Sequence, residues 1–109
     1  MNIIDLEGMN LVGLAWNEFH FDLKAIDASG VLFQATLSNP DQSPIHVTVH
    51  WLDMRMISEE DPEISTLGEL ETIGSEDGVV HIEADAGYFS VTAAKVFVQQ
   101  LTGLQGNAA

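Results

Sequence analysis

Apolar and polar side chains alternate through the stretch Phe19-His20-Phe21-Asp22-Leu23-Lys24-Ala25-Ile26. This period of two predicts a strand with one buried face, because successive side chains of a strand point to opposite sides. Turn residues follow at 27–30, and Gly30 can adopt a positive φ at little cost. A second alternating run occupies residues 31–38. Together the two runs predict an antiparallel hairpin.

The same pattern continues along the chain. In residues 45–51 the apolar Val47, Val49 and Trp51 share one side, so Trp51 is expected to pack in the core. Residues 93–101 suit either a bent strand or a short closing helix, and we favour the strand because β-branched valines flank Phe97. Further strands are expected over residues 67–73, 79–84 and 88–93, and residues 11–16 could form a first strand.

These segments predict a mostly β protein, arranged as a single antiparallel meander of six or seven strands. A curved sheet, an open barrel and a small sandwich all satisfy the pattern, with at most one short helix. One β-rich domain over residues 1–101 is expected, because 109 residues suit a single core. The small, glycine-rich residues 102–109 indicate a flexible C-terminal tail.

Composition excludes several classes of function. The chain has no cysteine, which suits a reducing compartment. Its first residues lack the basic region of a secretory signal, and no apolar run approaches the roughly 20 residues that span a bilayer. With only three Lys and Arg residues, direct binding to nucleic acid or to an anionic membrane is disfavoured. We therefore expect a cytoplasmic protein.

The strongest signal is the net charge. Seventeen acidic residues stand against three basic ones, giving a formal net charge of -14. Self-repulsion of this size works against the compact state, and solubility needs a magnitude of only about 2 to 8. We therefore expect a basic partner, although an ordinary solvated acidic surface is the alternative.

The acidic residues are concentrated between Asp53 and Asp85, where 11 of the 17 fall. On strands, Glu69 and Glu71 would share a face, as would Glu83 and Asp85, so rows of carboxylates are expected. Such rows become favourable when a basic surface covers them. The predicted partner-binding residues are Asp53, Glu59, Glu60, Asp61, Glu63, Glu69, Glu71, Glu76 and Asp77.

Neither a catalytic site nor a metal or cofactor site is predicted. His46 and His50 are four residues apart, which along a strand separates them by roughly 13 Å, too far to share a zinc ion. Four solvent-facing histidines are the simpler interpretation. No serine lies in a nucleophile elbow, and the glycines around residues 74–78 lie in an acidic turn that would repel phosphate.

The order of segments resembles a known family. The residues concerned are Trp16 followed by residues 19–23, the stretch 47–54, and the late segments 78–82 and 87–91. In these the chain resembles the Imm50-like immunity proteins of bacterial polymorphic toxin systems, although Asn17-Glu18 replaces the histidine-aspartate pair usual after the leading tryptophan. The resemblance implies an all-β protein that binds and neutralises a cognate toxin.

These observations lead to one functional hypothesis and its alternatives. We expect a non-enzymatic immunity or inhibitor protein whose acidic face occludes a basic toxin, for example a nuclease. A related alternative is a phage-type nucleic-acid mimic that occupies a nucleic-acid-binding protein. Another is an acidic secretion chaperone or a homo-oligomeric assembly subunit, in the form of a homodimer paired through an exposed strand edge.

Overall fold

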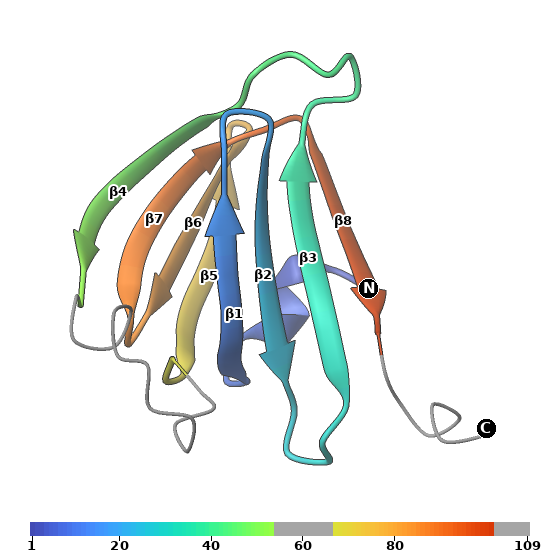
Figure 1. Cartoon of the computed structure of the whole chain (residues 1–109), viewed down its shortest axis with the longest axis vertical. Coiled ribbons are helices and arrows are strands. Elements are labelled where there is room, and N and C mark those ends of the chain that lie inside the picture. The colour runs from blue at the N-terminus through green and yellow to red at the C-terminus, as the bar shows by residue number, and fades with distance from the viewer. Residues whose placement is uncertain (54–66, 102–109) are drawn as a thin grey trace.

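A computed structural model describes residues 1–53 and 67–101. This part of the chain forms one short 3-10 helix and eight strands (Figure 1). They are η1 (Ile3–Leu6), β1 (Asn10–Trp16), β2 (His20–Ile26), β3 (Leu32–Ser38), β4 (His46–Leu52), β5 (Leu70–Glu76), β6 (Val79–Ala84), β7 (Gly87–Thr92) and β8 (Lys95–Gln100). The mostly β prediction is confirmed, and so is the strand expected within residues 93–101.

The prediction of a single meander of six or seven strands is wrong, because the described residues form eight strands in two sheets. The strands form a first sheet of order β1-β2-β3-β8 and a second sheet of order β4-β7-β6-β5, and all pairings are antiparallel. Strands β1, β2 and β3 form a meander in the first sheet, and the next strand, β4, lies at an edge of the second sheet. Strands β5, β6 and β7 form a meander in the second sheet, and the next strand, β8, lies at an edge of the first sheet. A sheet with one apolar face must cover that face, and two facing sheets cover each other. The described residues therefore form a small sandwich (Figure 1).

The two crossings between the sheets are held together by Asn39. Its side-chain Oδ1 accepts a hydrogen bond from the Ala94 backbone N–H at 2.8 Å, which links the β3–β4 connection to the β7–β8 connection. Its Nδ2 donates to the carbonyl oxygens of Ser43, at 3.3 Å, and Pro44, at 3.0 Å. One amide side chain thus supports both chain crossings.

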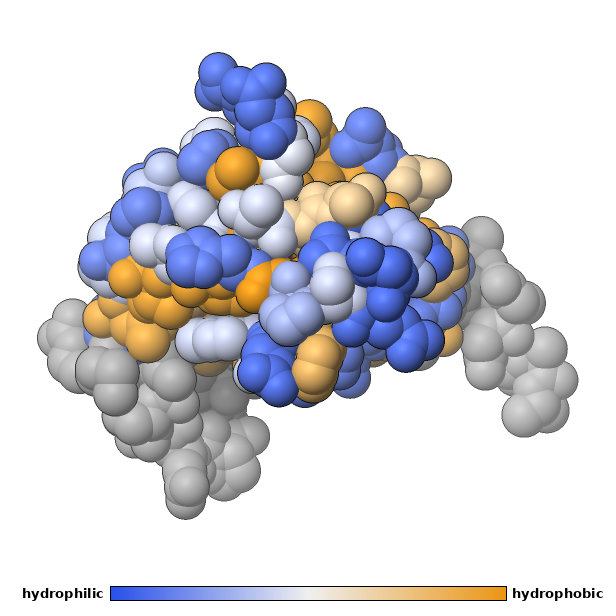
Figure 2. Space-filling view, turned by 90° about the horizontal axis from the view of Figure 1, so that it is seen from above, coloured by the Kyte–Doolittle hydropathy of each residue, from blue (hydrophilic) through white to orange (hydrophobic). Residues whose placement is uncertain are grey.

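The core lies between the two sheets. Phe21 of β2 and Phe89 of β7 are both fully buried, and their ring centroids are 5.5 Å apart. Trp16, at the end of β1, stacks on Phe21 at 5.7 Å and meets Phe89 edge-on at 5.4 Å. Trp16 is nevertheless 39% exposed, because it is the last residue of β1, which lies at an edge of the first sheet. Figure 2 shows hydrophobic surface on this side of the molecule, where β4 lies.

The N-terminal segment closes another side of the sandwich. The side chain of Asn2 accepts a hydrogen bond from the Ile4 N–H, and Asp5 accepts one from the Asn2 N–H, so the two residues form a capping box. This turn buries Ile3 and Leu6 in the core. The following Glu7 carboxylate accepts a hydrogen bond from the Ile73 N–H at 2.7 Å and so covers part of the β5 edge.

The two sheets are joined along one corner. Backbone hydrogen bonds connect Leu11 N to Gly68 O and Gly8 N to Leu70 O, both at 2.7 Å. An isolated bridge also pairs Asn10 with Glu69. The edges of β1 and β5 are therefore partly covered, whereas β4 and β8 form the outer edges of their sheets.

The expected core position of Trp51 is wrong. The register of β4 shifts between Val49, which pairs with Phe89, and Trp51, which pairs with Tyr88. This bulge turns Trp51 to the outer face of the second sheet, where it is 45% exposed. A one-residue irregularity thus reverses the face on which a large aromatic residue lies.

Two predicted segments fall outside the described residues. These are the flexible tail at 102–109 and the part of the acidic region that contains Glu59, Glu60, Asp61 and Glu63. In the part that the structure describes, no helix has both the length and the apolar character needed to cross a membrane.

Candidate docking surface

Four carboxylates meet at one end of the second sheet, and we call this group the acidic end. Glu69 and Glu71 lie at the start of β5, and Glu83 and Asp85 lie at the end of β6 and in the turn that follows. A hydrogen bond with the Asp85 carboxyl group raises the pKa of Glu71 above its ordinary value, and the charges of Asp85, Glu83 and Glu69 raise it further. Like charges this close destabilise the ionised form of Glu71.

Local backbone features bring these carboxylates together. The register of β5 against β6 shifts between Leu70 and Thr72, so Glu71 is an extra residue on the β5 side. Gly68 has a φ of +90°, and a Cβ atom at this position would stand 2.4 Å from the Asp85 Cβ. Because Gly68 has no side chain, Asp85 can approach and accept a hydrogen bond from the Glu69 N–H at 2.9 Å.

The acidic end has no cation beside it among the described residues. The ion pair found within residues 1–53 and 67–101 joins His20 to Asp22 at 3.1 Å, in the first sheet. Lys24 and Lys95 also belong to the first sheet, on β2 and β8. Within residues 1–53 and 67–101, no basic side chain therefore offsets the negative charge of the acidic end.

The structure places the predicted acidic residues in three groups. Glu69 and Glu71 belong to the acidic end, and the Asp53 N–H donates to the Ala86 carbonyl beside it at 2.8 Å. Glu76 ends β5 and Asp77 lies in the β5–β6 turn, at the opposite end of both strands. The remaining predicted residues, Glu59, Glu60, Asp61 and Glu63, lie outside the described residues.

Aromatic side chains adjoin the acidic end on the outer face of the second sheet. Cross-strand pairing places Trp51, Tyr88, Glu83 and Thr72 in one row over β4, β7, β6 and β5. Interfaces are enriched in exposed Trp and Tyr residues of this kind, because such rings bury large areas and lose little conformational freedom. The row therefore combines apolar anchors with negative charge.

Two histidines in the next row share one hydroxyl group. The Ser90 Oγ lies 2.7 Å from His50 Nε2 and 2.8 Å from His81 Nδ1, and the His50 ring stacks on Tyr88 with centroids 4.2 Å apart. With both imidazoles neutral, the hydroxyl donates to one ring and accepts from the other. Acyl transfer would also need N–H groups aimed at an oxyanion. Ser90 instead lies in the middle of β7 and pairs with Thr48 on one side and His81 on the other. Backbone N–H groups at such a position form the hydrogen bonds of the sheet.

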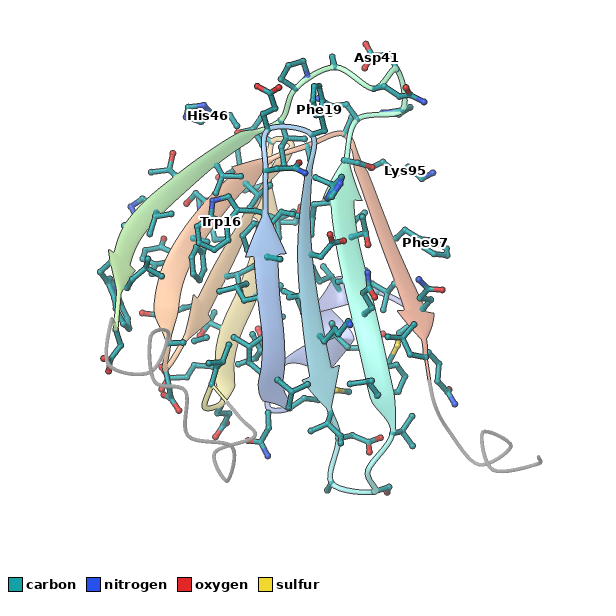
Figure 3. All side chains as sticks on the ribbon, viewed as in Figure 1. Trp16, Phe19, Asp41, His46, Lys95 and Phe97 are labelled. Carbon is teal, nitrogen blue, oxygen red and sulfur yellow. The ribbon has the colours of Figure 1, made fainter. Side chains whose placement is uncertain are left out.

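A hollow in the described part of the chain lies away from the acidic end. It has a volume of about 600 Å³ and lies where the β1–β2 turn, the β3–β4 connection and the start of β8 meet, the region of Phe19, Asp41 and Lys95 in Figure 3. The residues that line this hollow are Phe19, His20, Ser38, Asn39, Pro40, Gln42 and Lys95. Among the described residues no three His, Asp or Glu side chains are arranged to hold a metal ion.

Sequence reasoning missed three features of this surface. Glu83 and Asp85 were expected to share a face but were left out of the predicted partner-binding set, although they complete the acidic end. The outward position of Trp51 depends on a bulge that alternation does not reveal. The contact of His50 and His81 with Ser90 depends on strand order. A comparison with protein families, curated proteins and solved structures found no match for this chain.

Proposed function

We propose that this chain is a non-enzymatic inhibitor protein that docks through the acidic end onto a basic partner. A toxin whose own substrate is a polyanion, such as a nuclease, fits this chemistry, because its substrate site must be basic. The inhibitor would cover that site and need no covalent step. The resemblance to immunity proteins of toxin systems agrees with this proposal.

The observation that carries the proposal is the clustering of Glu69, Glu71, Glu83 and Asp85 at one end of the second sheet. These carboxylates lie close together with no neighbouring cation among the described residues, and their repulsion, which raises the pKa of Glu71, is unfavourable in the free protein. A lysine or arginine from a partner would remove the repulsion and form charge-assisted hydrogen bonds with the same oxygens. Trp51 and Tyr88, in the adjoining row, supply apolar contact area.

The test compares two pairs of substitutions that remove the same charge. Glu69→Gln with Glu71→Gln alters the acidic end, and Glu76→Gln with Asp77→Asn alters the turn at the other end of the strands. Asn suits position 77 because the φ there is +52°. Each double variant changes the formal net charge from -14 to -12, so any difference between them reports position.

The probes are the purified products of the two genes that flank the coding sequence, with binding measured by calorimetry at low and high salt. We expect one product to bind and the first double variant to weaken binding at least tenfold more than the second. Binding should also weaken as salt rises, because exposed charges are screened over about 8 Å at physiological ionic strength. Equal losses from both variants would show that net charge alone matters. Failure of both products to bind would reject the immunity function.

A further inference from the structure

The two outer edges of the sandwich differ in how well they are protected. Proteins protect edge strands with bulges, charges or prolines, because an open ladder of N–H and C=O groups can pair with another strand. The edge strand β4 contains the bulge between Val49 and Trp51. The edge strand β8 pairs with β3 from Lys95 to Gln100 without a register shift. It contains no proline and no acidic residue.

The β8 edge is also apolar. Phe97 is 51% exposed and points away from the sandwich, as Figure 3 shows. Val96, on the inner face, is 39% exposed and lines a groove of about 320 Å³ with Met1 and Ile4 of the N-terminal segment. The side chains of this strip are neutral apart from Lys95, in a chain that carries -14 overall.

The β3–β8 pairing determines which backbone groups of β8 point away from β3. The Leu101 N–H donates to the Leu32 carbonyl at 2.8 Å, in continuation of the β3–β8 register. In an antiparallel ladder, alternate residues direct their backbone groups toward the same neighbour. The backbone groups of residues 95, 97, 99 and 101 therefore point toward β3, and those of Val96, Val98 and Gln100 point to the side on which no described strand pairs with β8.

We propose that β8 pairs antiparallel with β8 of a second copy of this chain, about a two-fold axis that passes through Phe97. A two-fold axis perpendicular to the sheet places inner residues of one copy opposite inner residues of the other. Only registers that pair odd-numbered residues with odd-numbered ones, and even with even, are therefore allowed. The register centred on Phe97 pairs Val96 with the second copy's Val98 through their free backbone groups. Lys95 then faces Gln99, and the two Phe97 rings form a cross-strand aromatic pair.

Charge determines which strand can occupy this edge. Two chains of net charge -14 repel, so a contact between copies requires a surface that lacks acidic residues, and β8 provides one. The acidic end lies in the second sheet, away from β8 (Figure 1). Pairing through β8 would join the two first sheets into one of eight strands and leave both acidic ends exposed. The dimer thus has two sites for the proposed partner, although it does not depend on that proposal.

The absence of cysteine from the chain allows a direct test of the register. Residues opposite one another in a non-hydrogen-bonded antiparallel pair have Cα atoms about 4.5 Å apart, within the range of a disulfide. In the proposed dimer Phe97→Cys places two thiols opposite each other. Gln99→Cys, on the same face of the same strand, places each thiol opposite Lys95. Under mild oxidation we expect covalent dimer from the first variant, at a rate at least tenfold higher than from the second.

Sedimentation equilibrium of the unmodified chain provides the independent measurement. We expect a mass twice the 11.8 kDa of one chain at micromolar concentration, and the monomer mass for Phe97→Lys, which brings two like charges together on the axis. Thr48→Lys, at the other outer edge, is the control and should remain dimeric. A monomeric unmodified chain would overturn the proposal, and so would equal cross-linking of the two cysteine variants.

Discussion

Replacing Phe89 by alanine is the most informative test of the sandwich. Phe89 is fully buried between the sheets, and its ring contacts Trp16 and Phe21 with centroid distances of 5.4 and 5.5 Å. A buried Phe→Ala substitution costs about 3–5 kcal/mol, because it removes apolar contact and leaves a cavity. Each aromatic pair adds about 0.5–1.5 kcal/mol to ordinary burial. We therefore expect a loss of about 4 kcal/mol in the free energy of unfolding.

Urea unfolding followed by tryptophan fluorescence measures this loss, and Trp16 reports directly because it contacts the substituted ring. With an m-value of about 1.5 kcal/mol/M, a loss of about 4 kcal/mol lowers the unfolding midpoint by about 2.5 M. Domains of this size have total stabilities of about 5–15 kcal/mol, so the variant should fold but with little reserve.

Phe19→Ala is the matched control. Phe19 lies in the β1–β2 turn and is 45% exposed, so the same chemical change should cost about 1 kcal/mol or less. A midpoint shift for Phe89→Ala no larger than that of the control would refute the packing of β2 against β7. A large shift for Phe19→Ala would show that the turn contributes to the core.

Two further outcomes are expected from single side chains. Asn39→Ala should lower the free energy of unfolding by about 1–2 kcal/mol, because the Ala94 N–H loses its acceptor. Asn39→Asp keeps an acceptor oxygen at this position and should recover part of the loss. Equal stability of the unmodified chain and the two variants in urea would contradict the role of Asn39. Glu71→Gln should stabilise the protein only at higher pH. The folded pKa of Glu71 is raised, so the folded state binds the proton more tightly, and the stability of the unmodified chain falls as pH rises from the ordinary value of 4.5 through the raised one. Urea midpoints of the two proteins should therefore coincide below this window and separate above it, and a constant difference at all pH values would exclude this origin.

Much of the strand content could be predicted from local pattern. Alternation in residues 19–26 and 31–38 corresponds to β2 and β3, and β-branched valines around Phe97 correctly favoured a strand for β8. These predictions succeed because a strand with one buried face must alternate, whatever it pairs with. The break in alternation caused by the β4 bulge could not be seen, because the bulge is defined by two residues that oppose one on β7.

The composition of the candidate site could be predicted, but its arrangement could not. Acidic residues near 69–71 and 83–85 were evident from the sequence, and alternation already grouped them by face. Their assembly into one cluster depends on the pairing of β5 with β6 and on the missing side chain of Gly68. The same pairing carries Glu76 and Asp77 to the other end of the sheet, although they are close to Glu71 in sequence.

The sequence by itself determined the class of this protein: a β domain with alternating strands and a net charge of -14. Both are properties of side chains counted along the chain, and they hold for any strand order. Only the tertiary structure decided that β4 joins the second sheet and β8 the first, that Trp51 faces outward, and which carboxylates lie close together. These depend on contacts between residues far apart in sequence, where burying both apolar sheet faces at once selects one pairing among many that share the same local pattern.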